Sequence, residues 1–166
     1  MKVPSDHDLQ EMAGRVAEAL MRVGGRMATA ESCTGGWIAK VCTDVAGCSD
    51  WFNGSLVTYN NAAKEHLAGV STALLQEHGA VSEPVVLAMA EGAVQALDAQ
   101  WGAAVSGIAG PTGGSVGKPV GTVWIAWGSA GNMQAERHIF IGDRDTVRRH
   151  SVAVALHNLL KTLQLQ

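Results

Sequence analysis

The sequence has few aromatic residues and few charges, and its lysines and arginines are scattered. Aromatic residues make up 5% and charged residues 16% of the 166 residues, and the net charge is −3. This balance excludes the basic surface of a nucleic-acid-binding protein, although a local phosphate site stays open. The scarcity of aromatic rings also disfavours a platform for stacking single-stranded bases. We therefore expect no nucleic-acid partner.

Long apolar runs, signal-peptide features and metal-binding spacings are also missing. No run approaches the roughly 18 to 20 apolar residues that cross a bilayer, and the start, MKVPSDHDLQEM, is polar and acidic. The odd set Cys33, Cys42 and Cys48 fits reduced thiols better than a disulfide framework. Neither Cys-x-x-Cys nor His-Glu-x-x-His occurs. We expect a soluble protein of the cytoplasm, without a membrane partner and without a zinc site.

Apolar residues, by contrast, are plentiful, at 47% of the chain. Their spacing predicts helices over residues 5–23, from 37 to about 45, after 61, over about 82–99 and after 143. Short apolar runs predict strands over residues 26–30, 56–59, 103–108, 123–127 and 134–141. Helices interleaved with apolar strands predict a single three-layer α/β/α domain over residues 1–166, with a mixed, mostly parallel sheet. Apolar helix faces fit a buried core and a homo-oligomer equally well.

The stretch TAESCTGG, residues 29–36, falls at a predicted strand-to-helix turn. Its two glycines permit a sharp turn and a close backbone approach to a ligand. Free N–H groups at the start of the following helix favour an anion or a developing oxyanion. An ordinary helix cap made by Ser32 or Thr34 fits the same residues. The Gly-x-Ser-x-Gly elbow of α/β-hydrolases is not present.

The only tyrosine, Tyr59, precedes Lys64 by five residues at another strand-to-helix junction. A lysine acts as a general base only if its pKa falls from about 10.4 towards roughly 7 to 8. Burial lowers the pKa in this way, because desolvation penalises the ammonium. A solvated lysine on a helix surface fits the spacing as well.

A glycine-rich loop, residues 106–119, follows a predicted buried strand and could surround a small ligand with backbone N–H groups. It differs from the phosphate-binding loop of ATPases, because Thr112 replaces the first glycine of that pattern and Pro119 follows Lys118. A flexible connection between two strands is the alternative.

Two arginines, Arg144 and Arg148, follow the predicted start of the last helix. Cations near a helix N-terminus are unfavourably placed for the helix dipole. A phosphate ligand would explain them, because guanidinium groups bind phosphate in a bidentate manner. Local pairing with Asp143 or Asp145 is equally plausible.

Together these stretches resemble the C-terminal domain of the CinA (competence/damage-inducible) family. The residues that carry the resemblance are 29–36 (TAESCTGG), 57–59 (VTY), 63–64 (AK), 79–82 (GAVS), 106–111 (SGIAGP), 118–123 (KPVGTV) and 142–144 (GDR). Each motif alone is weak, but the set in this order is specific and spans roughly residues 8 to 160. The separate N-terminal domain of longer CinA proteins lies outside this span, so its functions are not expected here.

The resemblance implies hydrolysis of the carboxamide of nicotinamide mononucleotide (NMN) to nicotinate mononucleotide and ammonia, in pyridine nucleotide salvage. It implies Ser32 as nucleophile and Lys64 as its base, with Tyr59 hydrogen-bonding within the dyad and with no metal or organic cofactor. Backbone N–H groups around residues 34–36 are the candidate oxyanion donors. The candidate substrate-binding residues are Thr34, Gly35, Gly36, Ser106, Gly107, Gly110, Arg144 and Arg148.

Two alternatives stay open. Cys33 could be the nucleophile, since a thiolate is intrinsically more reactive than a hydroxyl. Alternatively, the chain could be a non-catalytic nucleotide-binding or competence/damage-related interaction module of the same fold. Asn60 stands where the family more often has serine, but Tyr59 and Lys64 keep their spacing.

Overall fold

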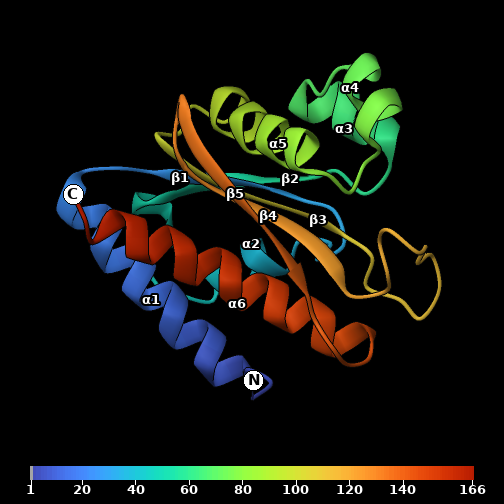
Figure 1. Ribbon diagram of the computed structural model, residues 1–166. Coiled ribbons are helices and arrows are strands. Elements are labelled where there is room, and N and C mark those ends of the chain that lie inside the picture. Colours follow the sequence, from blue (N-terminus) through green and yellow to red (C-terminus); the bar gives the residue numbers. More distant parts are fainter. Residues whose placement is uncertain (1) are drawn as a thin grey trace.

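One five-stranded sheet with helices on both faces organises residues 2–166, which the computed structural model describes (Figure 1). The elements, in chain order, are α1 (Asp6–Val23), β1 (Met27–Glu31), α2 (Trp37–Thr43), the 3₁₀ turn η1 (Cys48–Asp50), β2 (Phe52–Val57), α3 (Asn61–Ala68), α4 (Thr72–His78), α5 (Glu83–Ala96), β3 (Trp101–Gly107), β4 (Thr122–Ser129), β5 (Asn132–Ile139) and α6 (Arg144–Leu163). None of these helices is both long enough and apolar enough to cross a membrane.

The strand order is β2-β1-β3-β4-β5. β1 pairs in parallel with β2 and β3, whereas β4 is antiparallel to both β3 and β5. Within residues 2–166, β4 therefore runs against the other four strands, which confirms the mixed, mostly parallel sheet. The carboxyl ends of β1, β2 and β3 consequently lie along one edge of the sheet, where ligands bind in many α/β proteins.

Two apolar cores, one on each face of the sheet, confirm the three layers. β1 is buried throughout, and its side chains alternate between the cores: Met27 belongs to one, and Ala28 and Ala30 to the other. α1, α2 and α6 cover the first face, while α3, α4 and α5 cover the second (Figure 1). Burial on both faces explains the nearly continuous apolar runs of the central strands.

Helix starts follow the local sequence closely. Ser5 caps α1 in a capping box with Asp8, and Asp143 caps α6 by accepting from the N–H of Thr146 at 2.8 Å. The helix predicted after residue 61 is capped by Asn60, whose side chain accepts the N–H of Ala63 at 2.8 Å. α3 thus begins at Asn61.

Strand bounds and one helix differ from the prediction. β2 ends at Val57, so Thr58 and Tyr59 lie beyond the strand. The sequence pattern also missed α4, since its seven residues are too short to show a helical period. The ladder nonetheless continues past the strand ends, because Thr58 N–H donates to the carbonyl of Glu31 at 2.8 Å.

Candidate active site

Ser32 follows β1 directly and lies at the carboxyl edge of the sheet. Its N–H donates to the carbonyl of Val105 at 2.9 Å, which fixes it beside the end of β3. Its Oγ lies 3.1 Å from Nζ of Lys64 on α3. The fold therefore brings together a hydroxyl and an amine that are 32 residues apart in the sequence.

Close packing of α3 against α5 positions Lys64. A Cβ on Gly92 of α5 would lie 1.8 Å from the carbonyl oxygen of Ala68, so only glycine lets α3 approach α5 this closely. Lys64 is 1% exposed, and its Nζ donates to the carbonyl of Thr58 at 2.8 Å. The alternative of a solvated lysine on a helix surface is thereby excluded.

Burial lowers the pKa of Lys64, because desolvation penalises its ammonium form. Across residues 2–166, no carboxylate forms an ion pair with this side chain. Nζ donates to the Thr58 carbonyl and to Ser32 Oγ, and an amine that has lost its proton can accept the Ser32 hydroxyl proton across the same contact. The pair thus has the geometry of an alcohol beside its base.

Glu31 is a fully buried carboxylate whose importance the sequence pattern did not reveal. It accepts five hydrogen bonds, from the hydroxyls of Thr34 and Ser55 and the N–H groups of Gly36, Ile38 and Ala39. An acidic side chain just before a helix start is the signal that could have identified this role, since anions stabilise helix N-termini. Glu31 therefore fixes the turn between Ser32 and α2.

Most backbone N–H groups of this turn are consequently occupied. Gly36 donates to Glu31 at 3.1 Å, and Gly35 donates to the carbonyl of Ser32 at 3.1 Å. Among residues 32–39, the N–H groups of Cys33 and Thr34 have no acceptor within the described part of the chain. The predicted oxyanion donors were the N–H groups of residues 34–36. Of these, only the N–H of Thr34 is free in the structure, and the N–H of Cys33 is a further free donor.

Tyr59 reaches Ser32 through its main chain and Arg144 through its side chain. Its carbonyl oxygen lies 3.5 Å from Ser32 Oγ, whereas its own phenol accepts from Arg144 at 3.1 Å. The Tyr59 side chain is 61% exposed. Arg144 also donates to the carbonyl of Gly110 at 2.9 Å, so it links the glycine-rich loop to Tyr59.

The glycine-rich loop begins next to Ser32. Ser106 follows Val105, the residue of β3 that pairs with Glu31, so Ser106 and Ser32 are neighbours across the sheet. The Ser106 hydroxyl is buried and donates to the carbonyl of Ala80 at 2.6 Å. At Gly107 a Cβ would lie 2.6 Å from the Val123 side chain, which makes this glycine a requirement of the β3–β4 approach.

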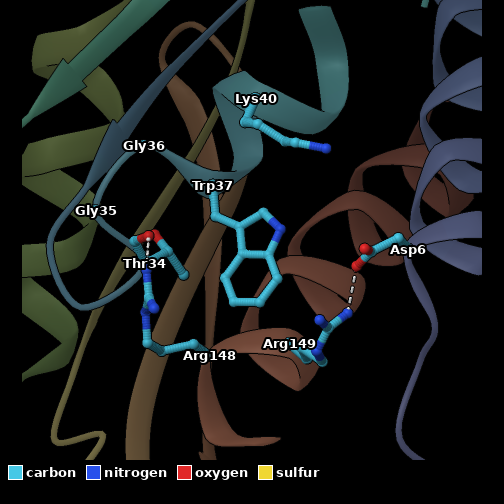
Figure 2. A pocket seen from close by; sticks show the side chains of 8 residues that line it. All are labelled: Asp6, Thr34, Gly35, Gly36, Trp37, Lys40, Arg148 and Arg149. Atoms are coloured by element: carbon cyan, nitrogen blue, oxygen red, sulfur yellow. Dashed lines mark hydrogen bonds and ion pairs between the residues drawn. The ribbon is translucent and has the colours of Figure 1, made fainter. Parts of the chain in front are cut away.

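Arg148 lies on the other side of the Ser32 turn. It borders a cavity of about 330 Å³, lined by Asp6, Thr34, Gly35, Gly36, Trp37, Lys40, Arg148 and Arg149. Figure 2 shows the side chains around this cavity. The Nε and one terminal nitrogen of Arg148 donate to the carbonyls of Cys33 and Thr34, at 3.0 and 2.9 Å. The guanidinium also lies 5.0 Å from the ring centre of Trp37.

Cys33 is poorly suited to nucleophilic attack. It is 5% exposed and packs in the core beneath α1, α2 and α6, whereas Ser32 meets Lys64 on the opposite face. Burial raises the pKa of the Cys33 thiol to about 12, so the reactive thiolate is scarce at neutral pH. Among residues 2–166, moreover, no three His, Cys, Asp or Glu side chains cluster to hold a metal ion.

Iodoacetamide should therefore leave the amide hydrolysis that the resemblance implies nearly intact. Alkylation requires a thiolate, and the two cysteines nearest the turn, Cys33 and Cys42, are both buried. The measurement is ammonia release before and after treatment of the folded protein, with Cys33→Ala as the matched variant. Loss of turnover on alkylation, with protection in Cys33→Ala, would restore the cysteine as nucleophile.

An α/β fold that places a buried hydroxyl beside a buried amine, at the carboxyl edge of its sheet, defines a class of protein equipped for nucleophilic attack. A family model described as the CinA C-terminal domain matches residues 9–163. The chain belongs to this family, which confirms the resemblance of the motifs.

Individual relatives match over nearly their whole length. The chain is 52% identical over 156 residues to the nicotinamide-nucleotide amidohydrolase PncC of Escherichia coli (strain K12), covering 93% of this chain and 94% of that protein. PncC of Pseudomonas putida is 51% identical, with 90% and 94% covered. The crystal structure of the competence damage-inducible protein A (ComA) from Klebsiella pneumoniae subsp. pneumoniae MGH 78578 superposes with a TM-score of 0.91 at 39% identity, covering 94% of this chain and 97% of that chain.

Proposed function

We propose that the chain is a nicotinamide-nucleotide amidohydrolase, which converts NMN and water to nicotinate mononucleotide and ammonia in pyridine nucleotide salvage. The observation that carries this proposal is the 3.1 Å contact between Ser32 Oγ and the buried amine of Lys64. The names of the PncC relatives, at about half identity over nearly the full chain, support the choice of substrate.

The first half of the reaction acylates Ser32. Lys64 accepts the hydroxyl proton as Oγ bonds to the carboxamide carbon, and the carbonyl π electrons move to the oxygen to give a tetrahedral oxyanion. The oxyanion collapses, the C–N bond breaks, and Lys64 returns the proton to the departing nitrogen as ammonia. One amine therefore serves as both base and acid, which requires a lysine that is neutral before attack.

The second half releases the product. Lys64 takes a proton from water, the water oxygen attacks the acyl carbon, and the ester bond to Ser32 Oγ breaks as Lys64 returns the proton to it. The product is the carboxylic acid, which loses its proton to water to give nicotinate mononucleotide, and Ser32 and Lys64 regain their starting protonation states. Both halves pass through an oxyanion, for which the free N–H groups of Cys33 and Thr34 are the nearest donors along the chain.

Substrate contacts beyond the dyad belong to the same proposal. Arg144, Gly110 and Tyr59 form one connected group that bridges the glycine-rich loop and the residue whose carbonyl faces Ser32. A guanidinium in this position suits the phosphate of a nucleotide, because it donates in a planar fork. We assign Arg144 to the phosphate and keep Tyr59 as the residue that holds Arg144 in place.

A non-catalytic binding module is less well supported. Burying an amine without a carboxylate partner costs stability, and ionisable groups whose pKa is shifted by burial are enriched at catalytic sites. A module that only bound nucleotides would have no need for this lysine beside a serine. The buried Lys64 therefore favours chemistry over binding alone.

Purified protein is expected to release one ammonia and one nicotinate mononucleotide for each NMN consumed. The measurement is an enzyme-coupled ammonia assay with chromatography of the nucleotides, and NAD and free nicotinamide serve as comparison substrates. If NMN binds but no ammonia appears from any of these amides, the binding module becomes the better proposal.

A further inference from the structure

We propose that Arg148 is a positioning residue that orients the oxyanion-binding peptide of the Ser32 turn, rather than a ligand of the substrate phosphate. The inference rests on the proposed amidohydrolase function. It explains why an arginine of α6 reaches 114 residues along the chain to bind main-chain carbonyls.

The hydrogen bonds of the turn show what Arg148 holds. It donates to the carbonyl of Cys33 at 3.0 Å and to the carbonyl of Thr34 at 2.9 Å. In a trans peptide the C=O and N–H point in opposite directions. Fixing the Cys33 carbonyl towards Arg148 therefore directs the next N–H, that of Thr34, away from Arg148.

This orientation leaves free the N–H groups that could bind the oxyanion. The Thr34–Gly35 peptide is held at both ends, since its carbonyl accepts from Arg148 and its N–H donates to the carbonyl of Ser32 at 3.1 Å. The N–H groups that remain without an acceptor within residues 2–166 belong to Cys33 and Thr34, the two residues after the nucleophile. Donors at this position stabilise the oxyanion only if they are fixed before the reaction.

A buried anion complements the arginine. Glu31 accepts from the Thr34 hydroxyl at 2.7 Å and from the Gly36 N–H at 3.1 Å. In the same turn, the Glu31 carboxylate therefore binds hydrogen-bond donors, while the Arg148 guanidinium binds carbonyl oxygens. Hydrogen bonds to charged groups are roughly twice as strong as neutral ones. Arg148 thus also polarises the peptide whose N–H would face the oxyanion.

Arg148 is itself immobilised, which suits a positioning role. Its guanidinium lies 5.0 Å from the Trp37 ring centre, and Arg149 lies 4.8 Å from the same ring (Figure 2). Arg149 provides the matched control, because it borders the same cavity but pairs with Asp6 at 2.6 Å and Asp145 at 2.7 Å instead of binding the turn.

The test compares Arg148→Lys and Arg148→Met with Arg149→Lys and Arg149→Met. We expect Arg148→Met to lower kcat for NMN by about 10- to 100-fold with KM nearly unchanged, as for loss of a supporting partner of a catalytic group. Arg148→Lys should recover part of the rate, since an ammonium can still donate to one carbonyl. Both Arg149 variants should retain the wild-type kcat.

Two binding measurements need no turnover. Pyridine-3-boronic acid forms a tetrahedral, negatively charged adduct with a serine hydroxyl and so mimics the oxyanion. Its affinity should fall in the Arg148 variants by the same factor as kcat, while the affinity for nicotinate mononucleotide stays unchanged. If Arg148→Met does not fold, Arg148→Lys supplies the same comparison.

Each contrary outcome is distinct. A raised KM and weaker product binding with an unchanged kcat would assign Arg148 to the phosphate and overturn the inference. Equal losses in boronate and product binding, or equal losses in the Arg149 variants, would reduce Arg148 to a structural residue. Absence of ammonia release by the wild type would instead refute the proposed function, and boronate binding would still decide the role of Arg148.

Discussion

Lys64→Met is expected to lower kcat for ammonia release by at least about 1,000-fold, in the upper part of the range for general acid–base groups. The loss is large because one amine acts in both halves of the reaction. Methionine has a similar length and no charge, so packing between α3 and the sheet should persist. NMN binding should therefore change much less than kcat, which single-turnover and binding experiments can separate.

The same variant makes a prediction about stability and pH. The pKa of Lys64 is lowered in the folded protein, so its burial penalty is fully present below that folded pKa and vanishes above the unfolded value of about 10.4. Wild-type stability should thus rise with pH over this window relative to Lys64→Met. Thermal unfolding of both proteins at several pH values measures the difference, and a gap that is independent of pH would contradict the lowered pKa.

The pH profile of the wild-type rate depends on the same amine. Protonated Lys64 cannot accept the Ser32 proton, so kcat/KM should fall tenfold per pH unit below the folded pKa of Lys64. Because burial lowers that pKa, the inflection should lie below 10.5, the ordinary value for lysine. An inflection at or above 10.5 would contradict the lowered pKa of Lys64.

Ser32→Ala is expected to lower kcat by roughly 10,000-fold or more, because no other hydroxyl in residues 2–166 lies within hydrogen-bond distance of the Lys64 amine. The fold should be unaffected, since the loss of one small hydroxyl leaves the backbone bond to Val105 intact. Ammonia release and boronate binding measure the effect, and both should be lost together.

A second buried serine gives the control for this experiment. Ser151 on α6 is fully buried and donates to the carbonyl of Val147 at 2.8 Å, away from the dyad. Ser151→Ala should therefore cost stability without changing kcat. Substantial turnover by Ser32→Ala would require another nucleophile, and the acyl-enzyme step would have to be abandoned.

Local chemistry accounts for the parts of the fold that the sequence predicts well. Ser5 and Asp143 identify the starts of α1 and α6, because a cap depends on a side chain and an N–H three residues apart. The apolar runs of β3 and β4 predict buried strands, since such strands need apolar side chains on both faces. Strand ends are less well predicted, because a strand ends where its neighbour no longer offers backbone hydrogen-bond partners.

The candidate site divides in the same way. The motifs and the family they resemble led to Ser32 and Lys64, and the structure places them in contact. Glu31 as the anchor of the turn, the Thr58 carbonyl as a partner of the amine, and the bond from Arg144 to the Tyr59 phenol were not foreseen. Each joins atoms whose proximity depends on strand order or on helix packing.

By itself, the sequence determined the layered α/β architecture, the starts of α1 and α6 and the two strand-to-helix junctions that supply the hydroxyl and the amine, because periodicity and capping act over a few residues. Only the tertiary structure decided that the lysine is buried without a carboxylate partner among residues 2–166, that Cys33 packs in the core on the other face of the sheet and that Arg148 binds the Ser32 turn. Burial and electrostatics depend on all the neighbours of a group at once, and most of those neighbours are distant along the chain.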